Sequence, residues 1–238
     1  MKIKRQLLSV AMAMLLAFGA FILPVQAANK GPDKSSNSYA YIKIYQKSNT
    51  NAKGTWLYVS KNISEKTSKI SGATYNKKTN TLTLKNFKKA GYIVEANMMG
   101  TDFKIKVTGT NTVQSIRVFG DNYGGSLALT GKGKLTANKN KKAMYGIVVY
   151  AEASSSALSF AKGTKVTAYR GSEELVDYEG NVKKTTGDPV KVIGTKISKA
   201  SKALYSKGKL SGKVKKSTSG AGSKYYDFRI NAAKVTNK

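Results

Sequence analysis

Apolar and polar side chains alternate with a period of two along several short segments of the chain. Ile42 and Ile44 alternate with Lys43, and a similar alternation appears at residues 81–85. A period of two places successive side chains on opposite faces of a β-strand, so that one face is buried. Between residues 28 and 180, no segment has the apolar spacing of an amphipathic helix. The pattern therefore predicts an all-β fold.

A phrase of apolar residues and glycine recurs along the chain with a spacing near 22 residues. Its members stand at offsets 0, 2, 4 and 8 in each copy: Ile105, Val107, Gly109 and Val113; Leu127, Leu129, Gly131 and Leu135; and Leu158, Phe160 and Val166, with the glycine moved one place to Gly163. A second apolar strand precedes each copy, beginning at Ile93, Ile116 and Ile147. The last interval is longer because of a lysine-rich insertion at residues 138–142, which is expected to form a surface loop.

Repeats of this length predict a short parallel β-helix, also called a β-solenoid. Each coil is too small to bury its own apolar face, so neighbouring coils stack and share one core. Gly109 and Gly131 would supply the backbone angles that the corners need. The alternative is an antiparallel β-sandwich, which also has short strands at regular intervals.

The start of the chain has the composition of an export signal. Residues 1–27 combine a basic beginning, an apolar stretch and a small-residue site that ends at Ala27. These features are typical of a cleaved signal peptide, although an apolar stretch of this length could also anchor the chain in a membrane. We expect a secreted, extracellular protein, released or associated with the cell wall, with no transmembrane segment after cleavage. Residues 28–38 are expected to form a linker.

The remainder divides into a body and a basic extension. Residues 39–181 are expected to form the β-solenoid domain, with N-terminal capping strands. Residues 182–238 are more densely basic and rich in Lys, Ser and Gly, which predicts a flexible extension. Tyr226, Phe228 and Ile230 alternate with polar residues there, which predicts a terminal strand.

Charge narrows the possible partners. The chain has 42 Lys and Arg against 12 Asp and Glu, a formal net charge of +30, and neither His nor Cys. Zinc sites, thiol nucleophiles and imidazole bases of the usual kinds are therefore excluded, and we expect neither a cofactor nor a metal site. Most of the basic residues are Lys, which attracts anions diffusely rather than by bidentate contacts. The charge favours a polyanionic partner, bound without sequence-specific recognition of nucleic acid.

Aromatic side chains and one arginine are the candidate ligand-binding residues. Tyr and Trp rings stack on sugar faces and tolerate a wet surface. Trp56 and Tyr58 stand two residues apart, and Tyr41 and Tyr45 stand four residues apart. Side chains at even spacings in a strand point to the same side, so each pair is expected on one strand face. The candidates are Trp56, Tyr58, Tyr92, Arg117, Tyr123, Tyr145 and Tyr150. The alternative is that the tyrosines are ordinary strand residues that pack on the flanks of the fold.

An acidic group stands out in this basic chain, and its members are Glu173, Glu174, Asp177 and Glu179. Their spacing differs from that of a calcium loop, so a charged turn near the basic extension is the simpler interpretation. A polysaccharide lyase on a β-helix would need a basic residue in a cleft, and Arg117 with Asp121, or Arg170 with the acidic group, could supply it. A short solenoid offers little room for such a cleft, so we expect no enzyme activity.

Three runs of the sequence carry a family resemblance: residues 71–84, which end in the strand TLTL; residues 107–113, VTGTNTV; and residues 127–135, LALTGKGKL. They resemble secreted β-helix surface proteins of clostridial-type Firmicutes, some of which are described as carbohydrate-binding domains. The resemblance implies a right-handed coil and carbohydrate binding. Calcium-binding relatives have acidic loops where this chain has Lys, so the resemblance does not imply calcium, and it assigns no ligand-binding residue.

These observations together predict a secreted, non-catalytic protein that adheres to polysaccharide or to an anionic cell-wall polymer. One alternative is a polysaccharide lyase or hydrolase on the same scaffold. A second alternative is a self-assembling extracellular matrix protein that associates through exposed strand edges.

Overall fold

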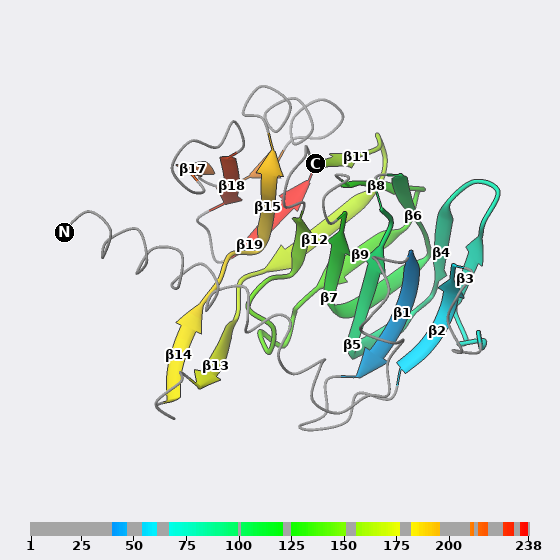
Figure 1. The fold of residues 1–238 in the computed structure, drawn as a ribbon, viewed down its shortest axis with the longest axis horizontal. Helices are drawn as coiled ribbons and strands as arrows, with labels where there is room; N and C mark the ends of the chain where they lie inside the picture. Colours follow the sequence, from blue (N-terminus) through cyan, green and yellow to red (C-terminus); the bar gives the residue numbers. More distant parts are fainter. Residues whose placement is uncertain are drawn as a thin grey trace, which may run out of the picture.

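The computed structural model describes residues 40–46, 54–60, 67–99, 101–120, 125–150, 156–176, 182–195, 210–211, 214–218, 226–230 and 234–237. The regular elements of these residues are all β-strands, in sheets of twelve, five and two strands (Figure 1). The all-β prediction is therefore confirmed. The expected signal peptide and linker lie outside the described residues.

The five-stranded sheet is parallel except at one edge. In spatial order its strands are β11 (Ser156–Phe160), β8 (Gly125–Thr130), β6 (Asp102–Thr108), β4 (Thr81–Lys85) and β3 (Ala73–Asn76). The first four run parallel to one another, and β3 forms an antiparallel hairpin with β4. Parallel neighbours cannot be joined by a tight turn, so the chain must leave this sheet between them.

The twelve-stranded sheet branches at its longest central strands. Its members are β1 (Tyr41–Gln46), β2 (Gly54–Val59), β5 (Lys88–Asn97), β7 (Thr110–Phe119), β9 (Lys134–Ala137), β10 (Ile147–Tyr150), β12 (Lys165–Tyr169), β15 (Val190–Thr195), β16 (Leu210–Ser211), β17 (Val214–Thr218), β18 (Tyr226–Ile230) and β19 (Lys234–Asn237). The first part of β7 pairs with β9 and its second part with β10, all parallel. On its other side β7 pairs with β5, which pairs with β1 in antiparallel orientation.

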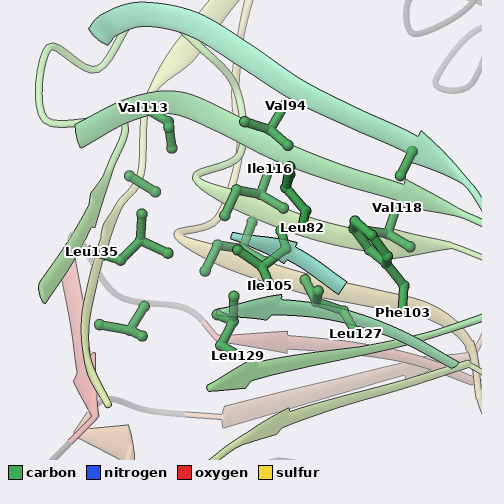
Figure 2. Packing of buried hydrophobic residues seen from close by; sticks show 14 of the residues in the cluster. Leu82, Val94, Phe103, Ile105, Val113, Ile116, Val118, Leu127, Leu129 and Leu135 are labelled. Carbon is green, nitrogen blue, oxygen red and sulfur yellow. The ribbon is translucent and has the colours of Figure 1, made fainter. Parts of the chain in front are cut away.

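The chain passes alternately from one sheet to the other. It runs from β4 to β5, from β6 to β7, from β8 to β9 and from β11 to β12. The repeated phrase corresponds to this unit: a strand of the five-stranded sheet, a corner, and the start of a strand in the twelve-stranded sheet. Figure 2 shows that Ile105, Leu127 and Leu129 meet Val94 and Ile116 in one core between the layers.

Two glycines and one asparagine shape the corners. Gly109 and Gly131 have φ of +67° and +93°, which confirms that they supply left-handed corner angles. Asn111 is fully buried beside them. Its Oδ1 accepts a hydrogen bond from the Phe87 backbone N–H (2.9 Å), and its Nδ2 donates to the Lys134 carbonyl (3.3 Å). This side chain therefore ties the corner of one repeat to the repeats on both sides.

The register agrees with the repeat in part. Ile147 pairs with Ile116, and Leu158 pairs with Leu127, as the spacing predicts. Leu127, however, pairs with Phe103 rather than with Ile105, so the first two copies are displaced by two residues. A shift of two keeps every side chain on its own face of the sheet, which is why the predicted core positions remain inside.

The pairing of β5 with β7 is displaced from the repeat by one residue. Val94, rather than Ile93, lies beside Ile116. A shift of one residue changes the face, so Val94 joins the shared core and Ile93 is buried on the outer side of the twelve-stranded sheet.

The described strands form two mixed sheets and show no closed solenoid. Their many parallel pairs exclude a purely antiparallel sandwich. A separate hairpin, β13 (Ser172–Val176) and β14 (Val182–Thr186), extends away from the sheets in Figure 1. The expected boundary at residue 181 falls between its two strands.

Beyond that boundary the chain continues in the twelve-stranded sheet. β15 pairs in parallel with β10, and β18 pairs with β15. The strand predicted at Tyr226, Phe228 and Ile230 is therefore confirmed as β18, and β19 follows it and pairs with β12.

Candidate binding site

A β-bulge in the first hairpin separates two of the candidate aromatic residues. Across β1 and β2, Trp56 lies opposite Lys43, whereas Tyr58 lies opposite Ile42. The Lys43 Nζ lies 4.7 Å from the Trp56 ring centroid, while Tyr58 packs against the core and, at 5.1 Å between ring centroids, against Tyr75. The prediction that Trp56 and Tyr58 share a face is therefore wrong, because one extra residue at the bulge reverses the alternation.

A row of buried charges crosses the outer face of the twelve-stranded sheet, which is turned away from the shared core. Lys43 lies opposite Glu95, and Glu95 lies beside Arg117 in the strand pairing. All three are buried, and their charges alternate in sign along the row. Opposite charges at neighbouring cross-strand positions stabilise a sheet. The residues are distant in sequence, so only the strand register brings them together.

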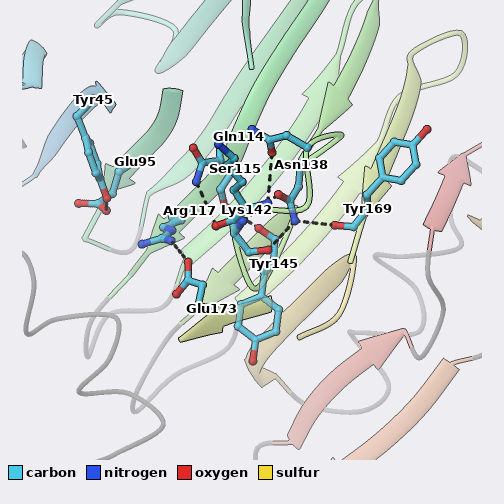
Figure 3. Close-up of polar contacts among 12 residues, drawn as sticks. Tyr45, Glu95, Gln114, Ser115, Arg117, Asn138, Lys142, Tyr145, Tyr169 and Glu173 are labelled. Carbon is cyan, nitrogen blue, oxygen red and sulfur yellow. Dashed lines mark hydrogen bonds and ion pairs between the residues drawn. The ribbon is translucent and has the colours of Figure 1, made fainter. Parts of the chain in front are cut away.

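Two tyrosines and a second carboxylate complete this cluster. The hydroxyls of Tyr41 and Tyr45 donate to the Glu95 carboxylate at 2.8 and 2.7 Å, which confirms that these tyrosines share a face. The Arg117 guanidinium donates to Glu173 at 3.5 Å, and both side chains are buried (Figure 3). Arg117, a candidate for ligand binding, is thus engaged within the protein.

The cluster changes the proton affinity of its members. Burial, and then the negative charge of Glu95, raise the pKa of Tyr45 well above its usual value. Burial alone would lower the pKa of Arg117, but Tyr45 in its ionised form and the negative charges of Glu173 and Glu95 raise it overall. The guanidinium is therefore charged throughout the neutral pH range.

Replacing Tyr45 with phenylalanine tests this arrangement by its pH dependence. At pH 8 we expect Tyr45→Phe to lower the free energy of unfolding by about 2 kcal/mol, because a buried hydrogen bond to a carboxylate is lost. Tyr45 ionises near pH 10 in the unfolded chain and only at higher pH in the folded protein. Its contribution is therefore complete below pH 10 and declines as the pH rises above 10. Urea unfolding of both proteins at pH 8 and pH 11 measures the difference in their free energies of unfolding, which should be smaller at pH 11. An equal difference at the two pH values would contradict the prediction.

Two further candidates, Tyr145 and Tyr150, meet on the same outer face. Tyr145 is buried with Met144 and Val148, and Tyr150 packs on this group. The Tyr145 carbonyl accepts a hydrogen bond from the Ser115 hydroxyl at 2.9 Å, which attaches the segment between β9 and β10 to β7. This position agrees with the alternative interpretation, in which the tyrosines pack on the flanks.

Tyr92 lies on β5, away from the other candidates. It is half-buried, its ring makes an edge contact with Phe87 at 6.5 Å, and the Lys89 Nζ lies 5.0 Å from its centroid. The remaining candidate, Tyr123, lies outside the described residues.

The acidic group is divided by the fold. Glu173 points inward to Arg117, whereas the side chain of Glu174 is exposed. Asp177 and Glu179 lie outside the described residues, as does Asp121, the partner considered for Arg117 in a lyase. The sequence singled out Glu173 for its acidic neighbours, yet its contact comes from a strand 56 residues away.

Exposed lysines that the composition alone does not single out lie on the outer face of the five-stranded sheet. On β6, the side chains of Phe103, Ile105 and Val107 are buried, and those between them are exposed. Lys104 and Lys106 therefore face solvent. The alternation of β6 was the signal that could have found them, since every second residue must point away from the core.

Charged residues of opposite sign occupy different places in the described part of the chain. Of the five carboxylates whose side-chain burial the structure describes, three are buried: Glu95, Glu173 and Asp188. Many lysines are exposed, and Lys134 and Lys165 lie side by side on neighbouring parallel strands. The surface formed by the described residues is therefore more uniformly basic than their composition alone indicates.

Comparison with protein-family models, with curated proteins and with solved structures finds no match for this chain. In the described part of the chain, no helix has the length and apolar character needed to cross a membrane. The same residues contain no group of three or more side chains suited to hold a metal ion.

Proposed function

We propose that the protein is a secreted, non-catalytic binding protein that attaches to anionic polysaccharide or to an anionic cell-wall polymer outside the cell. The observation that carries this proposal is the separation of charges, with many lysines exposed and three of the five described carboxylate side chains buried. The buried carboxylates Glu95 and Glu173 lie beside the buried cations Lys43 and Arg117, so they do not balance the charge of the exposed lysines. Such a surface attracts polyanions from solution.

The pairing of Lys134 with Lys165 supports the same conclusion. Like charges at directly neighbouring strand positions repel each other and destabilise a sheet. A polyanion that lies along these strands would place negative charge between them and remove the repulsion. Binding would then release the small counterions of both partners, which makes affinity depend on salt.

The aromatic residues favour charge over ring stacking as the source of affinity. The Trp56 and Tyr145 side chains are buried, with relative exposures of 8% and 7%. A buried ring offers no open face to a sugar. We therefore assign Trp56 and Tyr145 to packing and the affinity to Lys.

The scaffold that we propose is a short right-handed parallel β-helix with a basic C-terminal extension. The four crossings between the sheets and the parallel pairing of β4, β6, β8 and β11 support it. The composition of residues 1–27 supports secretion.

Retention on polymers at different salt concentrations tests the function. We expect the full chain to be retained on polygalacturonate, teichoic acid and DNA at about 50 mM salt and released at about 500 mM, because screening and counterion release weaken charge-driven binding. Cellulose, which is neutral, is the control and should retain little. Salt-resistant retention on cellulose would contradict charge as the cause, and release of unsaturated sugars from polygalacturonate would contradict a non-catalytic role.

A further inference from the structure

A cleft of about 580 Å³ lies between the β3–β4 hairpin and the corner that joins β4 to β5. Its lining combines hydroxyl groups with amines, and the side chains that carry them are Ser71, Thr74, Thr83, Lys85, Lys88 and Lys89. No acidic residue of the described chain lines it. We infer that this cleft is the subsite that binds the anionic group of one polymer unit, an inference that rests on the proposed function.

The walls of the cleft are held by the corner beneath them. The Lys85 backbone N–H donates to the Gly72 carbonyl at 2.8 Å, which joins the two sides. At the corner, the Asn86 Oδ1 accepts a hydrogen bond from the Thr110 N–H at 3.1 Å. A lining that is ordered before the ligand arrives loses less conformational entropy on binding.

The amines differ in how freely they move. Lys85 and Lys88 are exposed, whereas Lys89 is half-buried, with its Nζ 5.0 Å from the Tyr92 ring centroid and 6.0 Å from that of Phe87. The aromatic rings restrict the Lys89 amine near the cleft, while the other two can adjust to a ligand. Tyr92 thus supports a cation at the cleft, which differs from the direct stacking expected from the sequence.

The chemistry of the lining defines the ligand class. Hydroxyl groups exchange hydrogen bonds with the hydroxyls of a sugar or polyol, and three amines without an acidic neighbour favour a phosphate or carboxylate. Phe87, the aromatic residue in the lining, is only 1% exposed and offers no face on which a nucleic acid base could stack. The ligand is therefore an acidic saccharide or polyol chain that carries one phosphate or carboxylate in each unit.

Two variants with equal charge separate this site from general attraction. Lys85→Gln, Lys88→Gln and Lys89→Gln together remove three charges from the cleft. Lys139→Gln, Lys141→Gln and Lys142→Gln remove three exposed charges from the insertion loop. Calorimetric titration uses polygalacturonate as the carboxylate probe and poly(glycerol phosphate) as the phosphate probe, with thermal unfolding of each variant as the check on folding.

We expect the cleft variant to lose about tenfold or more in affinity for at least one probe, and the loop variant less than about threefold. The probe that is affected identifies the anionic group. Equal losses in the two variants would overturn the cleft as a site while leaving charge-driven binding intact. If the unaltered protein binds neither probe, the proposed function itself fails.

A measurement on the unaltered protein keeps the inference testable if the cleft variant does not fold. Polygalacturonate with a small fraction of its carboxylates activated as esters keeps its negative charge, and a nearby lysine amine displaces the alcohol of the ester to form an amide bond. Peptide mass spectrometry then locates the modified lysines. We expect Lys85 and Lys88 to be labelled ahead of Lys139 and Lys142, although all four are exposed. Labelling without this preference would overturn the inference.

Discussion

Replacing Glu173 with glutamine is expected to lower the free energy of unfolding by about 3 to 5 kcal/mol, which is the usual cost of breaking a buried ion pair. Glu173 contacts Arg117 at 3.5 Å, and their side chains are only 6% and 7% exposed. Glutamine keeps the size of the side chain but removes its negative charge, so a buried guanidinium loses a counter-charge. Many domains have only about 5 to 15 kcal/mol of stability, so the effect is large.

Two further variants identify the cause of this loss. Glu174→Gln removes the same charge from an exposed neighbour on the same strand and should change stability by less than about 0.5 kcal/mol. The double variant Arg117→Met with Glu173→Met should regain much of the loss, since apolar replacement of both partners leaves no buried charge from the pair. Urea unfolding measures all of them. Equal effects of Glu173→Gln and Glu174→Gln would show that the ion pair contributes nothing.

Replacing Gly131 with alanine is expected to cost about 3 kcal/mol, because both the backbone angle and the space are unsuitable. Its φ is +93°, and an added Cβ would overlap the Val107 carbonyl oxygen on the neighbouring repeat. The strands would have to separate, and the core between the two sheets would be disturbed with them.

Gly163 provides a matched control one repeat further along. Its φ is +87°, but an added Cβ would meet no atom of the described residues within 4 Å. Gly163→Ala should therefore cost only the left-handed angle, about 1 kcal/mol. Denaturant unfolding of both variants gives the difference. A cost for Gly163→Ala as large as that for Gly131→Ala would mean that the angle alone, without close packing of the repeats, makes glycine necessary.

The predictable parts of the fold are those that depend on neighbouring residues in sequence. Alternation at Ile105 and Val107 depends only on strand geometry, and these residues are buried as predicted. The glycine corners were also predictable, because they require angles that other residues rarely adopt. The pairing of Leu127 with Phe103 was not predictable from the sequence. A register shifted by two positions buries the same strand faces, so both registers fit the same alternation of apolar and polar residues.

The candidate sites show the same division. The sequence marked both Arg117 and Glu173 as unusual but predicted other roles for them. Arg117 was a candidate for ligand binding, and Glu173 was assigned to a charged turn. Their contact depends on where the β13–β14 hairpin lies, which no local pattern specifies. Trp56 and Tyr58 were assigned to one face because the bulge that separates them has no marker in their alternation.

By itself, the sequence determined an all-β chain with repeated strands, glycine corners and a large excess of lysine, because these follow from composition and from periods of a few residues. Only the tertiary structure decided which charges lie inside and which lie outside. It buried Glu95 and Glu173 near Arg117 and left lysines on the surface and around the cleft. Burial of a charge depends on partners from distant strands, so its outcome exists only once the strands are paired.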